Sequence, residues 1–233
     1  MTITAPSVDA AVAAPVPARA VRAVLVDDHQ LLAQSLSVAL QMEGVECSVA
    51  ELRDGDSLVR DVLALSPELV LLDLDLGGDL GDGSTLVAPF AEAGCRVLVV
   101  SASTDADQIS RALENGAVGV LSKAAPFQQL LDTALAAARG EQVMSSVERC
   151  RLIDEARARR TARSEAVAPF ERLSGREAQV LRAIAEGHSV GAIARSWVLS
   201  EATVRSQVRS ILTKLGVSSQ LEAVAAALRC GWL

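Results

Sequence analysis

Short apolar runs alternate with amphipathic stretches from Val21 to about residue 140, and this alternation limits the possible folds more than any other feature. Runs such as AVLVDD (23–28) and LVLLDLDL (69–76) are typical of buried strands, and the stretches between them have the apolar spacing of helices. A repeat of strand and helix predicts a parallel sheet that is covered on both faces. We expect strands at 23–28, 45–50, 69–76, 95–101 and 119–122, and helices at 30–42, 56–65, 84–93, 106–115 and 126–139.

The segment after residue 169 predicts short helices joined by tight turns. Ser174 and Glu177 form the pattern of a capping box, which is typical of the start of a helix. Further serines and glycines stand where other helices would begin and end, namely Ser189, Ser200, Ser219, Gly187 and Gly216. We expect helices at 174–186, 190–197, 201–215 and 220–229. The tight turn between the second and third of them indicates a helix-turn-helix.

Together these patterns predict an α/β protein with two folded domains. The first is a doubly wound (βα)5 parallel-sheet domain at 21–140, and the second is an all-α four-helix helix-turn-helix domain at 169–233. A partly helical linker at 141–168 connects them. Residues 1–20 contain three prolines and no basic leader, so we expect a disordered tail there.

Charge is distributed unevenly along the chain, whose net charge is −7. Residues 1–168 contain 14 basic and 24 acidic residues, whereas residues 169–233 contain 8 and 5. An acidic body followed by a basic end fits a regulatory domain joined to a domain that binds nucleic acid. No apolar run approaches the ~18 residues of a membrane-spanning helix. The four scattered cysteines favour free thiols, so we expect a cytoplasmic protein without a membrane segment.

Acidic residues stand where two of the predicted strands end. Asp27 and Asp28 follow the first strand, and Asp73 follows the apolar residues of the third. Because the carboxyl ends of parallel strands meet at one edge of a sheet, three carboxylates would converge there. Like charges in close contact are costly unless a cation joins them, and Mg²⁺ prefers such oxygen ligands. Ser101 and Lys123 end the fourth and fifth strands and would add a hydroxyl and an ammonium group.

Lysine usage supports a functional site at this edge. The chain has 22 basic residues, of which only Lys123 and Lys214 are lysines. A narrow site favours the compact ammonium group over the larger guanidinium. Any one of the five residues alone is more often an ordinary loop residue, but their shared position at strand ends favours a site.

Residues 21–140 resemble a response-regulator receiver domain, through VDDH (26–29), LLDLDL (71–76), VVSAS (99–103) and GVLSK (119–123). The whole chain resembles the NarL/LuxR-type response regulators. The resemblance implies that Asp73 accepts a phosphoryl group from a sensor histidine kinase. It further implies that Asp27, Asp28 and Asp73 hold Mg²⁺, that Ser101 is the switch hydroxyl, and that Lys123 is the cationic partner of the phosphoryl group.

Two departures from that family affect the first domain. The loop at 74–83 lacks the usual proline and is about two residues longer than usual, and Val120 stands where the family usually has an aromatic residue. A second hypothesis is therefore a DNA-binding regulator that does not depend on phosphorylation, in which the receiver serves for dimerisation or ligand sensing. A metal-dependent phosphohydrolase is disfavoured by the helix-turn-helix.

Residues 173–224 resemble the LuxR-type helix-turn-helix, through segments 173–187, 192–194 and 200–217. Within the predicted helix 201–215, an apolar stripe of Val204, Val208, Ile211, Leu212 and Leu215 would face the core. The other faces carry side chains that suit bases and phosphates in the major groove: Arg205, Ser206, Gln207, Arg209 and Lys214. Gln207 stands where the family often has histidine.

The sequence therefore predicts a transcription factor of a two-component system and not an enzyme. Its partners would be a sensor histidine kinase, double-stranded promoter DNA and a second copy of the chain. One small helix-turn-helix per chain favours binding to DNA as a homodimer. The apolar stripe of the last helix, with Leu221, Val224, Ala225 and Leu228, could pair with its copy or pack within its own domain.

Overall fold

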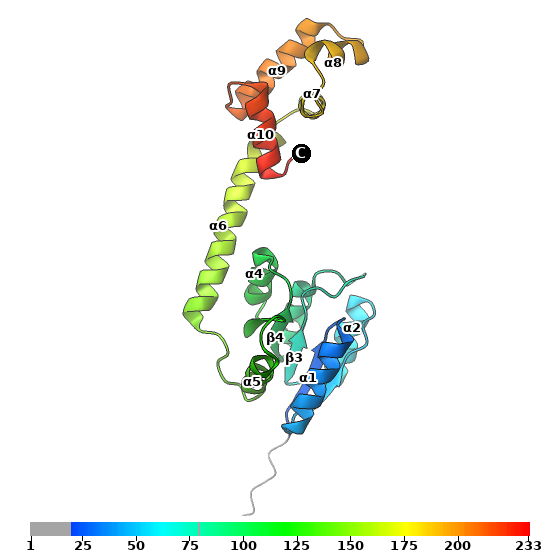
Figure 1. Ribbon diagram of the computed structural model, residues 1–233, viewed down its shortest axis with the longest axis vertical. Helices are drawn as coiled ribbons and strands as arrows, with labels where there is room; N and C mark the ends of the chain where they lie inside the picture. The colour runs from blue at the N-terminus through cyan, green and yellow to red at the C-terminus, as the bar shows by residue number, and fades with distance from the viewer. Residues whose placement is uncertain (1–19, 79) are drawn as a thin grey trace, which may run out of the picture. The chain divides into compact units, whose positions relative to one another are not determined.

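The computed structural model describes residues 20–78 and 80–233, and the predicted tail at 1–20 lies, except for its last residue, outside the described residues. The chain divides into two compact units, and the boundary along the sequence lies between Ile153 and Asp154. The first unit contains the sheet, and the second is helical (Figure 1).

A five-stranded parallel sheet forms the centre of the first unit and confirms the predicted α/β fold. The strands lie in the order β2-β1-β3-β4-β5 and all neighbours are parallel. The chain leaves β1 toward one edge and then crosses to build the other side, as in a doubly wound sheet. The strands are β1 (Arg22–Val26), β2 (Glu46–Val49), β3 (Leu69–Leu72), β4 (Arg96–Ser101) and β5 (Gly119–Ser122).

Helices cover both faces of the sheet, and alternate strand residues contact each layer. In β3, Val70 and Leu72 belong to the core under α2, α3 and α4, whereas Leu69 and Leu71 belong to the core under α1 and α5. The helices are α1 (Gln30–Met42), α2 (Gly55–Ala64), α3 (Val87–Glu92), α4 (Ala106–Glu114) and α5 (Phe127–Ala138), with a 3-10 turn, η1 (Gly83–Leu86), before α3.

The third predicted strand, 69–76, is too long. β3 ends at Leu72, and the chain then turns into a loop. Leu74 and Leu76 are nevertheless buried, because the loop folds back over the core on the side of α3 and α4. Their apolar alternation therefore reflects burial of a loop, which the sequence pattern does not distinguish from a strand.

The second unit packs its helices around one apolar core. Helix α6 (Ser146–Glu171) covers most of the predicted linker and contains residues of both units. The core of the second unit includes Val180, Ile193, Val204 and Ala223. The serines predicted as caps all accept a hydrogen bond at a helix start. The helices are α7 (Gly175–Ala185), α8 (Val190–Ser196), α9 (Glu201–Leu215) and α10 (Gln220–Cys230).

No single helix of the described residues is long and apolar enough to cross a membrane. The four cysteines are free thiols: Cys47 and Cys95 are buried, Cys230 is half-buried and Cys150 is exposed on α6.

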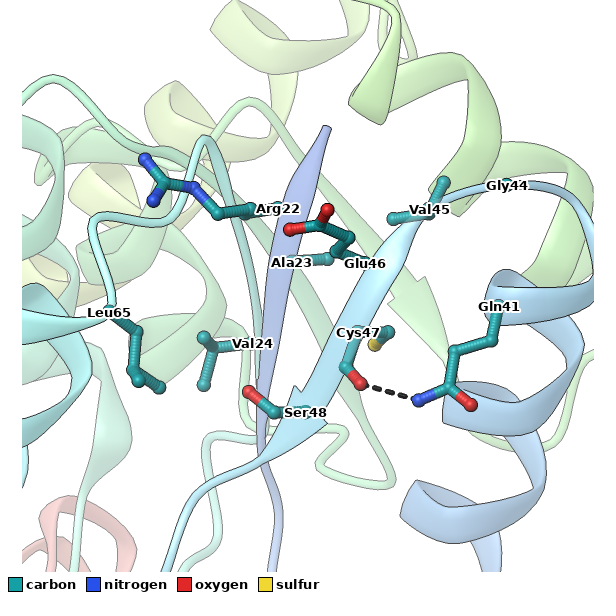
Figure 2. A pocket seen from close by; sticks show the side chains of 10 residues that line it. All are labelled: Arg22, Ala23, Val24, Gln41, Gly44, Val45, Glu46, Cys47, Ser48 and Leu65. Atoms are coloured by element: carbon teal, nitrogen blue, oxygen red, sulfur yellow. Dashed lines mark hydrogen bonds between the residues drawn. The ribbon is translucent and has the colours of Figure 1, made fainter. Parts of the chain in front are cut away.

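A shallow cavity of about 610 Å³ lies at the β2 edge of the sheet. Figure 2 shows its residues from β1, β2 and the end of α1, where Gln41 donates a hydrogen bond of 2.6 Å to the Cys47 carbonyl. None of the acidic residues predicted as a site lines this cavity.

Candidate functional sites

Two neighbouring strands place Asp27 and Asp73 side by side. Val26 of β1 pairs with Leu72 of β3, and each aspartate is the next residue of its chain segment. The Asp73 amide donates a hydrogen bond of 2.9 Å to the Val26 carbonyl. Both aspartates are buried, with exposed fractions of 8% for Asp27 and 2% for Asp73. The sheet therefore brings two ionisable groups together in a place with little solvent.

Lys123 lies between these two carboxylates. Its amide donates to the Ser101 carbonyl beyond the end of β5, and its Nζ lies 2.7 Å from Asp27 Oδ1 and 2.5 Å from Asp73 Oδ2. Burial lowers the pKa of Lys123, but the hydrogen bonds and charges of Asp27 and Asp73 outweigh it and hold the pKa above its ordinary value. Lys123 is thus a cation shared by two carboxylates.

The structure adds His29, which the sequence analysis did not single out. Its Nδ1 lies 2.6 Å from Asp28 Oδ1 and 3.2 Å from Lys123 Nζ, and its amide donates to Asp27 Oδ1 at 2.8 Å. The available signal was its position directly after the two aspartates, in a chain with only two histidines.

The donor set fits a divalent cation such as Mg²⁺. Ligand atoms of Asp27, Asp28, His29 and Asp73 all lie within 4.8 Å of one another. Three carboxylates face the single ammonium of Lys123, so they carry an excess of negative charge in a partly buried place. Carboxylate oxygens with room for several waters suit Mg²⁺, and the half-exposed side chain of Asp28 leaves the cluster open to solvent on that side.

In the described part of the chain, the Ser101 hydroxyl forms no hydrogen bond with the side chains of this cluster. Ser101 ends β4 and is buried, and its Oγ accepts a hydrogen bond of 3.1 Å from the Ser103 amide. It is connected to Lys123 through the backbone, at the Ser101 carbonyl. The structure therefore joins Asp27, Asp73 and Lys123 by side-chain contact and places an oxygen of Asp28 within 4.8 Å of the other two carboxylates. Ser101, the fifth predicted site residue, lies at the adjacent strand end.

The loop after Asp73 returns tightly against it at Gly83. The Gly83 amide donates a hydrogen bond of 2.8 Å to the Leu74 carbonyl. A Cβ at residue 83 would lie 2.3 Å from the Asp73 carbonyl oxygen and 3.1 Å from Leu74 Cα. Only glycine fits this approach, so Gly83 helps to set the backbone position of Asp73.

Asp82, in the same loop, connects the loop to α4. Its carboxylate accepts hydrogen bonds from Gln108 Nε2 at 3.0 Å and from Arg111 Nη2 at 2.8 Å. Partial burial raises the pKa of Asp82, but hydrogen bonds from Ser84, Gln108 and Arg111 outweigh it, so the pKa lies below its ordinary value. The loop is therefore held to α4 by an ionised carboxylate.

Helix α9 presents four of the five predicted DNA-binding residues to solvent, and only Gln207 is half-buried. Val204, Val208 and Ile211 are buried in the core, as predicted. Arg205, Ser206 and Arg209 are exposed, and Arg205 forms a 3.0 Å ion pair with Glu201 one turn earlier. These residues leave hydrogen-bonding groups on one open side of the helix.

Exposed Lys214 and half-buried Gln207 also have contacts inside the domain. Lys214 Nζ lies 2.6 Å from Glu177 Oε2, and the exposed fraction of the Glu177 side chain is only 9%. Burial raises the pKa of Glu177, but hydrogen bonds from Lys214, Ser210 and Ser174 outweigh it and lower the pKa to about 2. Gln207 is half-buried, and its Oε1 is enclosed without a hydrogen-bond partner among the described residues. Its position beside Val208 puts it at the border of the core.

Two family models match the two units of the chain. Residues 23–135 match the response regulator receiver domain, and residues 171–227 match the bacterial regulatory proteins of the luxR family. The chain is therefore a two-component response regulator with a DNA-binding domain. It belongs to the NarL/LuxR family of transcriptional regulators, which confirms the family, fold and function predicted from the sequence.

Relatives match over most of their length. The probable transcriptional regulatory protein NarL of Mycobacterium tuberculosis is 34% identical over 209 residues, which cover 90% of this chain and 94% of that protein. The nitrate/nitrite response regulator protein NarL of Escherichia coli is 30% identical over 200 residues, which cover 86% and 91%. A structure of the response regulator RcsB of Salmonella typhimurium is similar with a TM-score of 0.46 and 25% identity, over 91% of this chain and 98% of that chain. The roles of the individual site residues stay predictions.

Proposed function

We propose that this regulator accepts a phosphoryl group on Asp73 from a sensor histidine kinase, and that phosphorylation promotes its dimerisation and its binding to promoter DNA. The observation that carries the proposal is the buried Asp73 carboxylate, which shares Lys123 with Asp27 at the carboxyl edge of the sheet. In this proposal, residues 21–140 take the phosphoryl group, residues 169–233 bind DNA, and 141–168 connect them. The protein acts in the cytoplasm as a regulator and not as an enzyme.

The chemistry is an in-line attack of an Asp73 oxygen on phosphorus. A bond forms between Asp73 and phosphorus, and the bond from phosphorus to the nitrogen of the donor histidine breaks. Asp27, Asp28 and Asp73 would hold Mg²⁺, which would offset the charge of the phosphoryl oxygens when bound. Lys123 can turn one hydrogen bond toward a phosphoryl oxygen while it keeps Asp27 as a partner. The Ser101 hydroxyl would donate its hydrogen to a phosphoryl oxygen, because the Ser103 amide occupies only an acceptor position of Oγ.

Intact mass after incubation with acetyl phosphate and Mg²⁺ tests this assignment. We expect the wild type to gain the mass of one phosphoryl group and Asp73→Asn to gain none. Asp75→Asn is the matched control, because Asp75 is an exposed carboxylate two residues away, and it should label like the wild type. Labelling of Asp73→Asn at the wild-type level would reject Asp73 as the acceptor.

The DNA-binding part of the proposal places α9 in the major groove. Exposed Arg205, Ser206 and Arg209 would contact bases and phosphates, and Gln207 would contact a base after a small rotation of its half-buried side chain. Lys214 has three N–H donors, of which two bind Glu177 and the Arg172 carbonyl, so one is free for a phosphate.

A regulator that does not depend on phosphorylation is the second candidate. The longer loop at 74–83 and Val120 favour it, because the loop directly follows Asp73 and Val120 stands where the family usually has an aromatic residue. The two candidates differ in one measurement, the affinity for promoter DNA before and after treatment with acetyl phosphate. We expect the treatment to raise the affinity of the wild type and to leave that of Asp73→Asn unchanged. Equal affinities in all four samples would favour the second candidate.

A further inference from the structure

The turn between α8 and α9 contains a valine in a backbone conformation that favours glycine. Val198 has a φ of 54°, which lies in the left-handed region. A β-branched residue is a genuine outlier there, because its side chain crowds the backbone. Among the described residues, the other non-glycine residue with a positive φ is Ser66, which is not β-branched. The turn of the helix-turn-helix is therefore strained at Val198.

Hydrogen bonds at the end of α8 require this conformation. The Val198 amide donates to the Arg195 carbonyl at 3.3 Å, and the Leu199 amide donates to the Ala194 carbonyl at 2.9 Å. These two bonds form a Schellman motif, which ends a helix through one residue in the left-handed region, usually glycine. Leu199 then packs against the core of the second unit. Val198 thus occupies the one position of the motif where a side chain is unfavourable.

Helices α7, α9 and α10 end with the same pair of hydrogen bonds, but with glycine in place of valine. The left-handed residues that follow them are Gly187, Gly216 and Gly231, with φ values of 87°, 67° and 71°. The same domain therefore uses glycine at three equivalent positions. Val198 is an exception to the pattern of its own domain.

Packing inside the domain does not offset the strain at Val198. The residue is 91% exposed, so its side chain buries almost no apolar surface. Asparagine is polar and tolerates the left-handed region, and it would suit both the backbone and the solvent at this position. Valine is therefore unfavourable in the free protein for two separate reasons. An exposed and strained residue of this kind points to a contact outside the chain.

The strained turn lies directly before the part of α9 that we place in the major groove. Val198 is three residues before Glu201, the first residue of α9, so the two Cα atoms lie within about 11 Å of each other. Arg205 pairs with Glu201 at 3.0 Å. A Cβ at Gly191 would lie 3.0 Å from Glu201 Oε1 and 3.4 Å from Arg195 Nη1. Two arginines and one glutamate therefore gather where α8 and α9 meet, and their excess positive charge suits DNA.

Thymine carries the group that a valine can recognise in DNA. Phosphates and most of the base edges are polar, and an apolar side chain forms no hydrogen bond with them. The exception in the major groove is the C5-methyl group of thymine, which proteins contact with apolar side chains. An apolar side chain next to the start of α9 is therefore matched to this one base.

We propose that Val198 is a specificity-determining residue, which contacts the C5-methyl group of a thymine when α9 enters the major groove. The inference rests on the DNA-binding part of the proposed function and not on the phosphorylation of Asp73. The contact removes both apolar groups from water, which favours binding. Val198 then lowers the stability of the free domain and raises its affinity for a site with thymine at that position.

A DNA duplex selected from a random pool by the full-length wild type, treated with acetyl phosphate and Mg²⁺, is the probe. Each thymine of the selected site is replaced in turn by deoxyuridine, which pairs with adenine but lacks the C5-methyl group. In the wild type we expect one position in each half-site at which the replacement weakens binding about fourfold, the effect of one buried methyl group. Val198→Asn should bind the thymine duplex about fourfold more weakly and should not respond to the replacement.

Urea unfolding of the same variants separates a DNA contact from damage to the fold. Val198→Asn relieves the strain, so we expect the equilibrium constant for unfolding of the second unit to fall about tenfold. Val198→Ile keeps a β-branched apolar side chain, and it should keep the preference for thymine without a gain in stability. Ser66→Asn is the matched control, because it changes the other exposed residue with a positive φ, in the receiver. It should leave the affinity and the thymine preference unchanged.

The outcomes distinguish this contact from the DNA-binding function itself. A wild-type thymine preference in Val198→Asn would overturn the contact and leave DNA binding intact. Weaker binding by Val198→Asn, without any response of the wild type to deoxyuridine, would also overturn it, because Val198 would then contact another group. A lower stability of Val198→Asn would remove the strain on which the inference depends. If the wild type enriched no duplex from the pool, the DNA-binding part of the proposed function would fail, and the contact with it.

Discussion

The two candidate sites of this response regulator are built in opposite ways. In the receiver, Asp27, Asp73 and Lys123 come from the ends of three strands and meet in a buried cluster. In the DNA-binding unit, Arg205 and Arg209 lie on the open side of one helix. The receiver cluster therefore depends on the topology of the sheet, whereas the DNA-binding surface depends on the direction of each side chain around the axis of α9.

This difference decides which residues can be exchanged. A buried cluster of opposite charges loses its balance when one member is removed, because the remaining charges have little water to stabilise them. An exposed helix face loses one contact with each substitution, and its other residues stay as they were. The receiver site should therefore respond to substitutions as a unit, and α9 should respond residue by residue.

The largest effect is expected for Lys123→Met. The substitution leaves Asp27 and Asp73 buried without their cation, which should lower the free energy of unfolding of the receiver by about 3 kcal/mol. Mg²⁺ should restore part of it, because it binds the folded cluster. Urea titrations with and without Mg²⁺ measure both effects. Arg53→Met, which removes an exposed arginine that pairs with Glu51, should leave stability nearly unchanged, because exposed ion pairs contribute little. Equal effects of the two substitutions would contradict the role of Lys123.

Gly83→Ala should have a slightly smaller effect, about 2 kcal/mol of stability, because the added Cβ displaces the backbone of Asp73 and Leu74. It should also slow phosphorylation by acetyl phosphate, which intact mass measured over time detects. Gly55→Ala is the control in the same unit, because a Cβ there meets only ordinary contacts with Leu80 and Leu86 at 3.9 Å. A normal labelling rate in Gly83→Ala would show that the loop does not position Asp73.

The third prediction concerns acid and the DNA-binding unit. The pKa of Glu177 is lowered from 4.5 to about 2 in the folded chain, so its stabilising effect is complete above the unfolded pKa and is lost as the pH falls toward the folded value. The loss should reach about 2 kcal/mol by about pH 3. Unfolding of wild type and Glu177→Gln should therefore differ clearly at neutral pH and converge in acid. If the difference in the free energy of unfolding between the two proteins stayed constant from neutral pH to about pH 3, the ionised form of Glu177 would not be the source of the stabilisation.

These first predictions also indicate how far the sequence alone could lead. The alternation of apolar and amphipathic segments predicts the strand ends that carry Asp27, Asp73 and Lys123. The three residues then lie close together because all strands of a parallel sheet end at the same edge. The attachment of Asp82 to Arg111 and the close approach of Gly83 could not be predicted, since they depend on where a loop without periodicity folds. The partners of Lys214 and the partial burial of Gln207 were missed for a related reason. Gln207 borders the core, and exposed Lys214 reaches the buried carboxylate of Glu177. The apolar periodicity of α9 predicts only the residues at the centre of its buried face.

The smallest effect is expected for Lys214→Ala in DNA binding. If Lys214 contacts a phosphate, the salt dependence of binding should fall by about one unit of slope on specific and random duplexes alike. Arg209→Ala is the matched comparison, because Arg209 is exposed on the same helix. Titrations across a salt series measure both variants. A normal slope for Lys214→Ala, together with a reduced slope for Arg209→Ala, would show that Lys214 pairs with Glu177 but does not contact a DNA phosphate.

The exposed thiol of Cys150 offers a spectroscopic handle at a useful position. It is adjacent to Arg149, at the start of α6, whereas Cys47 and Cys95 are buried and Cys230 is half-buried. A maleimide fluorophore or a nitroxide spin label should therefore react first at Cys150 without any engineered cysteine. The rotational mobility of such a label would report on the first turns of α6 in real time, in the intact regulator and in the presence of DNA.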